Sequence, residues 1–163
     1  MKKIIIAILL ALPMTMFAQK IGHVNTGAVV QGMSEYAAAQ TELQTLAKQF
    51  EEELTRKQSD FQAKNEAYQK EAANLSETLK QYREQELQKA YDELMQFNQT
   101  CQQELQKQEQ AKLSEIQEKV MKAVQEVGNA GGYAYILDAA SIPFIGTSAS
   151  DITDQVKAKL GVK

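Results

Sequence analysis

The sequence of 163 residues predicts an α+β fold, in which a long α-helical hairpin is inserted between the strands of a small β body. Three observations predict this fold. All eight glycines and both prolines lie outside residues 33–127, so 95 consecutive residues contain no helix breaker. Short, strand-like apolar segments flank this stretch on both sides. The chain then closes with the pattern of a capped amphipathic helix.

Composition narrows the class of protein. With 44% hydrophobic and 24% charged residues, the chain is an ordinary folded protein rather than a collagen, a disulfide-rich scaffold or a multi-span membrane protein. A formal net charge of −3 without a basic block argues against nucleic acid as the main partner. We recognise no phosphate-binding loop, nucleophile or acid–base pair, so we expect no catalytic residue, no cofactor, no metal and no enzymatic activity.

Residues 1–18 have the pattern of a secretory signal peptide. Lys2 and Lys3 precede the unbroken apolar run of residues 4–12, and cleavage is expected after Ala18. The run is far shorter than the roughly 20 residues that span a bilayer, which disfavours the alternative of an uncleaved anchor. The mature chain then begins at Gln19, has 145 residues and carries a net charge of −5. We expect it to work outside the cytoplasm and without ATP.

Residues 33–127 are predicted to be helical, because strong helix formers dominate and apolar residues recur every seven positions. The first ladder runs through Ala47, Leu54, Phe61, Tyr68, Leu75 and Tyr82, with Leu43, Phe50, Ala72 and Leu79 beside it. Later ladders run through Leu87, Leu94 and Cys101, and through Leu113, Val120 and Val127. These ladders predict a coiled-coil seam, and Gly128 is expected to end the helix.

The flanks predict that this helix folds back on itself. Residues 20–25 and 133–138 read as strands, and residues 142–145 as a third, but neither flank can build a core alone. A hairpin brings the two flanks together, with its turn expected near the midpoint, between Ser76 and Glu86. The domain organisation is therefore a body of residues 19–32 and 128–163 and a hairpin of residues 33–127.

The end of the chain reads as a short helix that seals this body. Asp151 is expected to cap it, with Asp154 near its N-terminus. Ile152, Val156 and Leu160 then lie on one face at spacings of four.

Several side chains have two interpretations. Cys101 is expected to be a small buried residue, although an unpaired cysteine outside the cytoplasm could also pair between chains or act as a redox thiol. His23 is expected to be a structural residue with its hydrogen bonds satisfied, rather than a catalytic one. Tyr91, Met95 and Phe97 suit either adaptable binding of apolar segments or the hairpin seam, and the sequence leaves both open.

Three motifs in this order resemble the Skp or OmpH-like family of periplasmic chaperones. They are the opening strand Ile-Gly-His-Val-Asn of residues 21–25, the returning strand Tyr-Ile-Leu-Asp-Ala of residues 135–139, and the terminal Asp-Ile-Thr-Asp-Gln-Val of residues 151–156. The resemblance covers nearly the whole mature chain. It implies a homotrimer with a shared barrel-like body, from which three hairpins surround a cavity that holds unfolded outer-membrane proteins in the periplasm.

Individual residues are candidates for the roles that the resemblance implies. The candidate client-binding residues are Tyr91, Met95 and Phe97, and the candidate residues of the trimer body are Ile21, Val24, Tyr135, Leu137, Ile152, Val156 and Leu160. The expected function is that of an ATP-independent holdase. The alternatives are a structural coiled-coil protein of the envelope and a hairpin adaptor of an export channel, both without chaperone activity.

The chain differs in charge from the better-known members of the Skp or OmpH-like family, whose hairpins are strongly basic. Residues 33–127 carry 18 acidic and 12 basic residues. A basic site for membrane or lipopolysaccharide is therefore doubtful, and its only candidates near the expected turn are Lys80 and Arg83.

Overall fold

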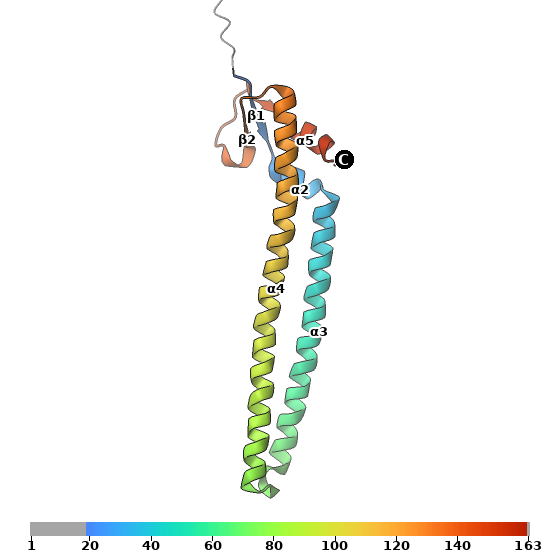
Figure 1. Ribbon diagram of the computed structural model, residues 1–163, viewed down its shortest axis with the longest axis vertical. Coiled ribbons are helices and arrows are strands. Elements are labelled where there is room, and N and C mark those ends of the chain that lie inside the picture. Colours follow the sequence, from blue (N-terminus) through green and yellow to red (C-terminus); the bar gives the residue numbers. More distant parts are fainter. Residues whose placement is uncertain (1–18, 163) are drawn as a thin grey trace, which may run out of the picture.

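The computed structural model describes residues 19–162, and the predicted signal peptide lies outside them. Two long antiparallel helices extend from a small body at one end of the molecule (Figure 1). The strands are β1 (Ile21–Val24), β2 (Tyr135–Asp138) and β3 (Ser150–Asp151). The helices are α2 (Thr26–Gly32), α3 (Ser34–Glu71), α4 (Glu77–Gly131) and α5 (Thr153–Lys159), with 3₁₀ turns η1 (Ala72–Asn74) and η2 (Ala139–Ser141). The predicted fold class, a helical hairpin on a small β body, is confirmed.

The sheet explains why the hairpin must fold back. Its strand order is β2-β1-β3, and β1 pairs in parallel with both neighbours. Parallel neighbours need a long crossover connection, and the whole hairpin is the crossover between β1 and β2. The register joins Ile21 to Tyr135 and Val24 to Asp138.

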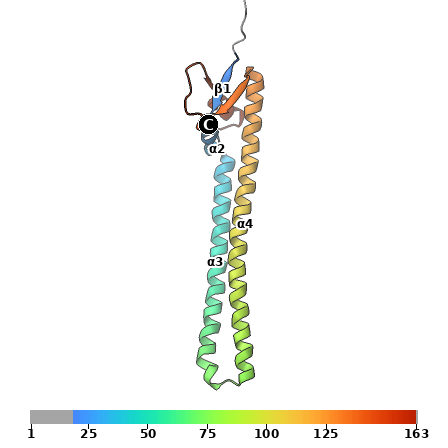
Figure 2. The same ribbon diagram turned by 90° about the vertical axis from the view of Figure 1, so that its left-hand side faces the viewer.

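The two arms of the hairpin differ in length. Helix α3 has 38 residues and α4 has 55, and the difference corresponds to about 26 Å of helix. The extra length of α4 runs alongside the body to the start of β2 (Figure 2). The four residues of β1 and seven of α2 span about 24 Å, which accounts for the difference.

Because the two arms differ in length, the turn lies before the midpoint of residues 33–127. The chain reverses through η1, Leu75 and Ser76, earlier than the predicted Ser76–Glu86. The midpoint argument was wrong because it assumed equal arms. Ser76 accepts a hydrogen bond from the backbone N–H of Leu79 at 3.4 Å and so caps α4.

The helix boundaries also differ at both ends of the hairpin. Thr26–Gly32 forms a separate helix that the sequence analysis missed, and the extended backbone of the buried Met33 separates it from α3. At the other end, the prediction that Gly128 stops the helix was wrong. Helix α4 continues to Gly131, and Gly132 takes the left-handed conformation with φ of 65°. Its N–H bonds the Asn129 carbonyl, which is typical of a glycine helix stop.

The core of the body lies where β1, α2, α4 and α5 meet. Val24, Val29, Ile152 and Val156 are among its most deeply buried side chains. Helix α4 contributes Ile116, Val120, Ala123 and Val124, so its last turns are part of the body's core. The predicted strand at residues 142–145 was wrong: this segment has no strand structure here, and β3 lies at Ser150–Asp151.

No helix within residues 19–162 combines the length and apolar character that a membrane crossing requires.

Candidate functional site

The seam between α3 and α4 follows the predicted ladders. Most ladder side chains are half-buried between the two helices, and Cys101, Ile116, Val120, Ala123 and Val124 are buried. Leu79 and Tyr82 are exceptions, because the earlier turn leaves both exposed near the start of α4. Cross-helix contacts join Phe50 to Phe97 and Phe61 to Tyr91, with ring centroids 6.3 Å and 5.9 Å apart.

The three candidate client-binding residues lie in different environments. Phe97 is half-buried in the seam, edge-on to Phe50, and the Lys57 ammonium lies 5.3 Å from its ring centroid. Tyr91 contacts Phe61 but remains 46% exposed. Met95 is 50% exposed. Tyr91 and Met95 therefore offer contact area to a partner, whereas Phe97 mainly packs the hairpin.

Cys101 has the environment expected of a packing residue. Its side chain is 3% exposed within the seam, and burial raises the pKa of its thiol. A raised pKa reduces the thiolate that redox chemistry needs. The interpretation of Cys101 as a small buried residue is confirmed.

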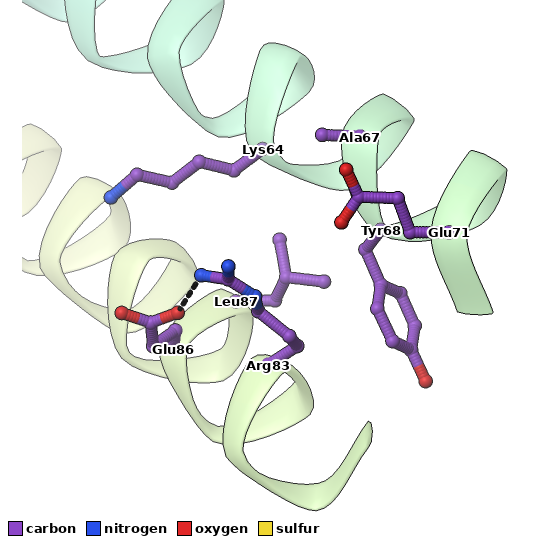
Figure 3. Close-up of a pocket in the computed structure, with 7 residues that line it drawn as sticks. All are labelled: Lys64, Ala67, Tyr68, Glu71, Arg83, Glu86 and Leu87. Atoms are coloured by element: carbon purple, nitrogen blue, oxygen red, sulfur yellow. Dashed lines mark hydrogen bonds and ion pairs between the residues drawn. The ribbon is translucent and has the colours of Figure 1, made fainter. Parts of the chain in front are cut away.

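The turn end of the hairpin holds a mixed-charge cluster. Figure 3 shows Lys64 and Glu71 on α3 facing Arg83 and Glu86 on α4, around a cavity of about 200 Å³. The Arg83 guanidinium donates to Glu86 at 2.8 Å, which lowers the pKa of that carboxyl. Two cations and two carboxylates thus share this cavity. Arg83, one of the two candidates for a basic membrane site, is already paired.

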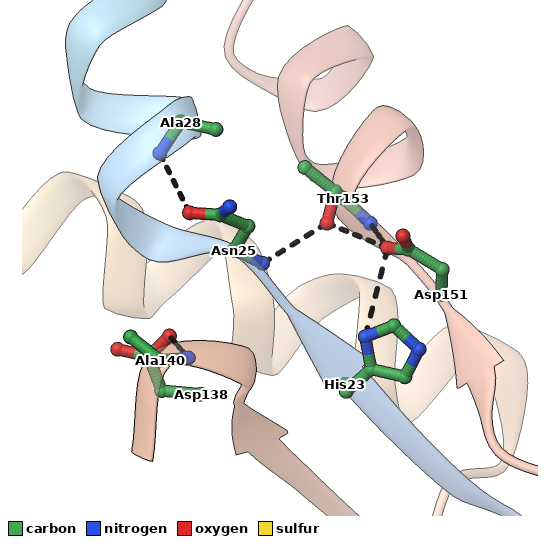
Figure 4. Close-up of polar contacts among 7 residues, drawn as sticks. All are labelled: His23, Asn25, Ala28, Asp138, Ala140, Asp151 and Thr153. Atoms are coloured by element: carbon green, nitrogen blue, oxygen red, sulfur yellow. Dashed lines mark hydrogen bonds and ion pairs between the residues drawn. The ribbon is translucent and has the colours of Figure 1, made fainter. Parts of the chain in front are cut away.

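A polar cluster ties the end of β1 to the start of α5 (Figure 4). The Asn25 side chain accepts from the Ala28 N–H at 2.9 Å and caps α2, while the Asn25 N–H donates to the Thr153 hydroxyl at 3.0 Å. The Thr153 hydroxyl and N–H both donate to Asp151, at 2.6 Å and 2.8 Å, and these bonds lower the pKa of the Asp151 carboxyl. The prediction that Asp151 caps the terminal helix was wrong in position: Ile152 is the N-cap residue of α5, and Asp151, at the end of β3, accepts the N–H of the first helical residue from one position earlier.

His23 lies beside this cluster. Its Nδ1 is 4.0 Å from the Asp151 carboxylate, and within the part of the chain described here it is buried without a hydrogen-bond partner. The expectation that its hydrogen bonds are satisfied was therefore wrong. Among residues 19–162, no group of three or more His, Cys, Asp or Glu side chains is placed to hold a metal ion.

The two faces of the sheet differ. Side chains alternate along a strand, so Gly22, Val24 and Ile136 face the core. The opposite face carries Ile21, Tyr135 and Leu137, which all remain exposed in the single chain. Val24, Ile152 and Val156 are buried within one chain and Leu160 is half-buried, so the candidate residues of the trimer body divide into an inner and an outer set.

The most exposed large apolar side chain of the described residues was not singled out from the sequence. Phe144 is 81% exposed in the segment between η2 and β3. The apolar run of residues 142–145 was a signal for it. It adds a fourth unpartnered apolar side chain to the body.

The OmpH-like outer membrane protein family matches residues 20–160, which include both the body and the hairpin. The chain belongs to this family. It is 26% identical over 139 residues to the chaperone protein Skp of Photorhabdus laumondii, and the match covers 85% of this chain and 84% of the relative. The crystal structure of a protein assigned to the OmpH-like outer membrane chaperones of Caulobacter crescentus CB15 superposes with a TM-score of 0.75. That match has 22% identity and covers 87% of this chain and 83% of the other. The resemblance drawn from the sequence is confirmed.

Proposed function

We propose that this OmpH-like protein is an ATP-independent holdase of the periplasm, which binds unfolded outer-membrane proteins between the hairpins of a homotrimer and prevents their aggregation. The observation that carries the proposal is the family match over both body and hairpin, residues 20–160. The names of its relatives, a chaperone and an outer membrane chaperone, support the same activity. The signal-peptide pattern of residues 1–18 supports export to the periplasm.

The uncovered apolar face of the body supports the trimer. Ile21, Tyr135 and Leu137 are neighbours on one face of the sheet and expose apolar surface to water. Phe144, in the adjoining segment between η2 and β3, exposes further apolar surface. Exposed apolar clusters of this kind mark protein interfaces, and burying them against copies of the same chain would remove them from water.

The hairpin supplies weak contacts to clients. Tyr91 and Met95 combine flexible or amphipathic side chains with half exposure, which suits many apolar sequences without selecting one. Three hairpins around one client raise the effective concentration of these contacts, so that weak individual contacts add to useful avidity. Release needs no nucleotide if a downstream acceptor binds the client more tightly.

Aggregation of a client tests the proposal. An unfolded outer-membrane β-barrel protein is diluted from urea with and without the purified mature chain, and light scattering records aggregation. A holdase suppresses the scattering at about one trimer per client and needs no ATP. A coiled-coil spacer or a channel adaptor leaves the scattering unchanged, and that result would refute the proposal.

A further inference from the structure

The mature chain is expected to begin with a glutamine. The signal-peptide pattern of residues 1–18 places the expected cleavage after Ala18, so Gln19 becomes the N-terminal residue. Cleavage gives Gln19 a free α-amine in addition to its side-chain amide. In an N-terminal glutamine these two groups are spaced to close an unstrained five-membered ring, and the reaction is favoured because both reactants belong to the same residue.

The structure leaves the Gln19 side chain free to react. The side chain is exposed, and the residue lies outside β1. Among residues 19–162, Gln19 takes part in no side-chain hydrogen bond and no ion pair. No contact within this part of the chain therefore has to be broken for the side chain to fold back on its own nitrogen.

The chain is anchored from the next residue onward. The Lys20 carbonyl accepts a hydrogen bond from the Ala134 N–H at 2.8 Å. The Lys20 ammonium donates to the carbonyl of Gly131, the last residue of α4, at 3.0 Å, and lies 4.1 Å from the centroid of the Tyr133 ring. Lys20 thus ties the start of the chain to the segment that leads into β2.

Loss of the first two residues would affect the sheet directly. Ile21 begins β1, the central strand, so only Gln19 and Lys20 separate the new N-terminus from the strand that pairs with both β2 and β3. An aminopeptidase that removed these two residues would take away the Lys20 contacts and reach β1. Aminopeptidases require a free α-amine, so a reaction that consumes this amine protects the strand.

We propose that Gln19 of the mature chain cyclises to pyroglutamate, and that this lactam caps the chain one residue ahead of the anchored Lys20. The α-amine nitrogen attacks the Cδ carbonyl carbon of the same residue, and a new N–C bond closes the ring. The bond between Cδ and Nε2 breaks, the attacking amine gives a proton to the departing nitrogen, and ammonia leaves. The step needs no oxidant, reductant or co-reactant. This inference rests on the export and cleavage in the proposed function and is independent of client binding.

Cyclisation also changes the charge at the start of β1. A free α-amine has an ordinary pKa of about 7.7–8.0 and is largely protonated at neutral pH, whereas a lactam nitrogen carries no charge. The reaction therefore removes one positive charge per chain. That charge would otherwise lie beside the Lys20 ammonium and two residues from Ile21, which is on the exposed face of the sheet.

The intact mass of the exported protein tests the proposal. The full chain is expressed with residues 1–18, purified from the periplasm and incubated at neutral pH. Its mass is expected to equal that of residues 19–163 less one ammonia. Edman degradation is expected to give no sequence until pyroglutamyl aminopeptidase removes the first residue, after which the sequence begins at Lys20.

Gln19→Asn is the matched control. Its side chain is one methylene shorter, so the same attack would have to close a strained four-membered ring. The variant is expected to keep its full mass and its free amine, and to be shortened by a general aminopeptidase that leaves the unsubstituted chain intact. Both chains are expected to suppress client aggregation equally, because Gln19 is not part of the hairpin.

The outcomes separate this inference from the holdase function. A chain that begins at Gln19 and keeps its amine after incubation would overturn the lactam and leave export and client binding untouched. A chain that begins at any other residue would overturn both the cleavage after Ala18 and the lactam. Equal shortening of the two chains by the aminopeptidase would overturn the protective role.

Discussion

Gly128 lies directly against Ile136. A Cβ atom built at Gly128 would come within 2.7 Å of the Ile136 Cδ1, so the glycine in the interior of α4 allows β2 to approach the helix. In an open helix, replacing glycine by alanine stabilises by about 1 kcal/mol. Here the added methyl group forces the flexible end of the Ile136 side chain to move, and the packing lost by that movement is expected to cancel the gain.

A double-mutant cycle tests this contact. Gly128→Ala alone is expected to leave the free energy of unfolding unchanged or lower, as measured by urea denaturation. In an Ile136→Val background, which lacks the Cδ1 atom, the same substitution is expected to stabilise. If Gly128→Ala stabilises equally in both backgrounds, the close approach has no energetic role.

Phe97 and Met95 are expected to respond differently to truncation. Phe97→Ala removes the edge-to-face contact with Phe50 and is expected to cost about 1–3 kcal/mol of stability, less than a fully buried phenylalanine. Met95→Ala is expected to change stability by less than about 0.5 kcal/mol and to weaken client binding. Thermal unfolding and client dissociation constants distinguish the two roles. The assignment fails if Phe97→Ala weakens binding at unchanged stability.

The exposed face of the sheet is expected to hold the trimer together. Leu137→Glu places a charge among Ile21 and Tyr135, and burying that charge in an interface is costly. We expect the purified variant to be monomeric by light scattering while retaining its helical circular dichroism. Gln62→Glu, on the exposed side of α3, serves as the matched control and is expected to remain trimeric. A trimeric Leu137→Glu variant would place the interface elsewhere.

Lowering the pH is expected to reduce the stability of the body. Hydrogen bonds from the Thr153 hydroxyl and N–H hold the pKa of Asp151 below its ordinary value, and the Thr26 hydroxyl does the same for Asp138. A lowered folded-state pKa means that the ionised carboxylate stabilises the fold above the ordinary value of about 3.9, and that this contribution is lost as the pH falls through the folded-state pKa. The urea midpoint should therefore decline as the pH falls below the ordinary carboxyl pKa of about 3.9.

A substitution at Asp151 tests whether its carboxylate causes the loss of stability in acid. Asp151→Asn removes the titrating group and is expected to flatten the decline of the urea midpoint with acid. A variant with the same slope as the unsubstituted chain would assign the acid sensitivity to other groups.

Salt is expected to leave binding of an acidic client unchanged or to strengthen it. The mature chain carries a net charge of −5, so a trimer would carry −15 and would repel such a client at long range. Between about 0.01 M and 0.15 M salt the screening length falls from about 30 Å to about 8 Å, which weakens this repulsion. Client dissociation constants against salt concentration test the expectation. Steep weakening by salt would show that local positive charge, such as Lys119 and Lys122, dominates the encounter.

The sequence was sufficient to predict the elements that are specified by residues close together in the chain. The 95 residues without glycine or proline predicted the helical hairpin, and the seven-residue ladders predicted its inward face, including the buried Cys101. The spacing of Ile152, Val156 and Leu160 likewise predicted the inner face of the terminal helix. The periodicity of apolar residues shows which face of a helix or strand is apolar. This can be read from the sequence without knowing which other elements pack against that face.

Tertiary structure decided where those elements begin, end and meet. The turn lies at η1 because α4 must run past β1 and α2 to reach β2, a requirement of parallel pairing that no residue near the turn encodes. Gly128 lies inside α4 with Ile136 packed against it, whereas Gly132, where φ is positive, ends the helix. The sequence by itself therefore determined the hairpin and its seam. Contacts between distant segments determined the lengths of its arms and the exposed face of the sheet.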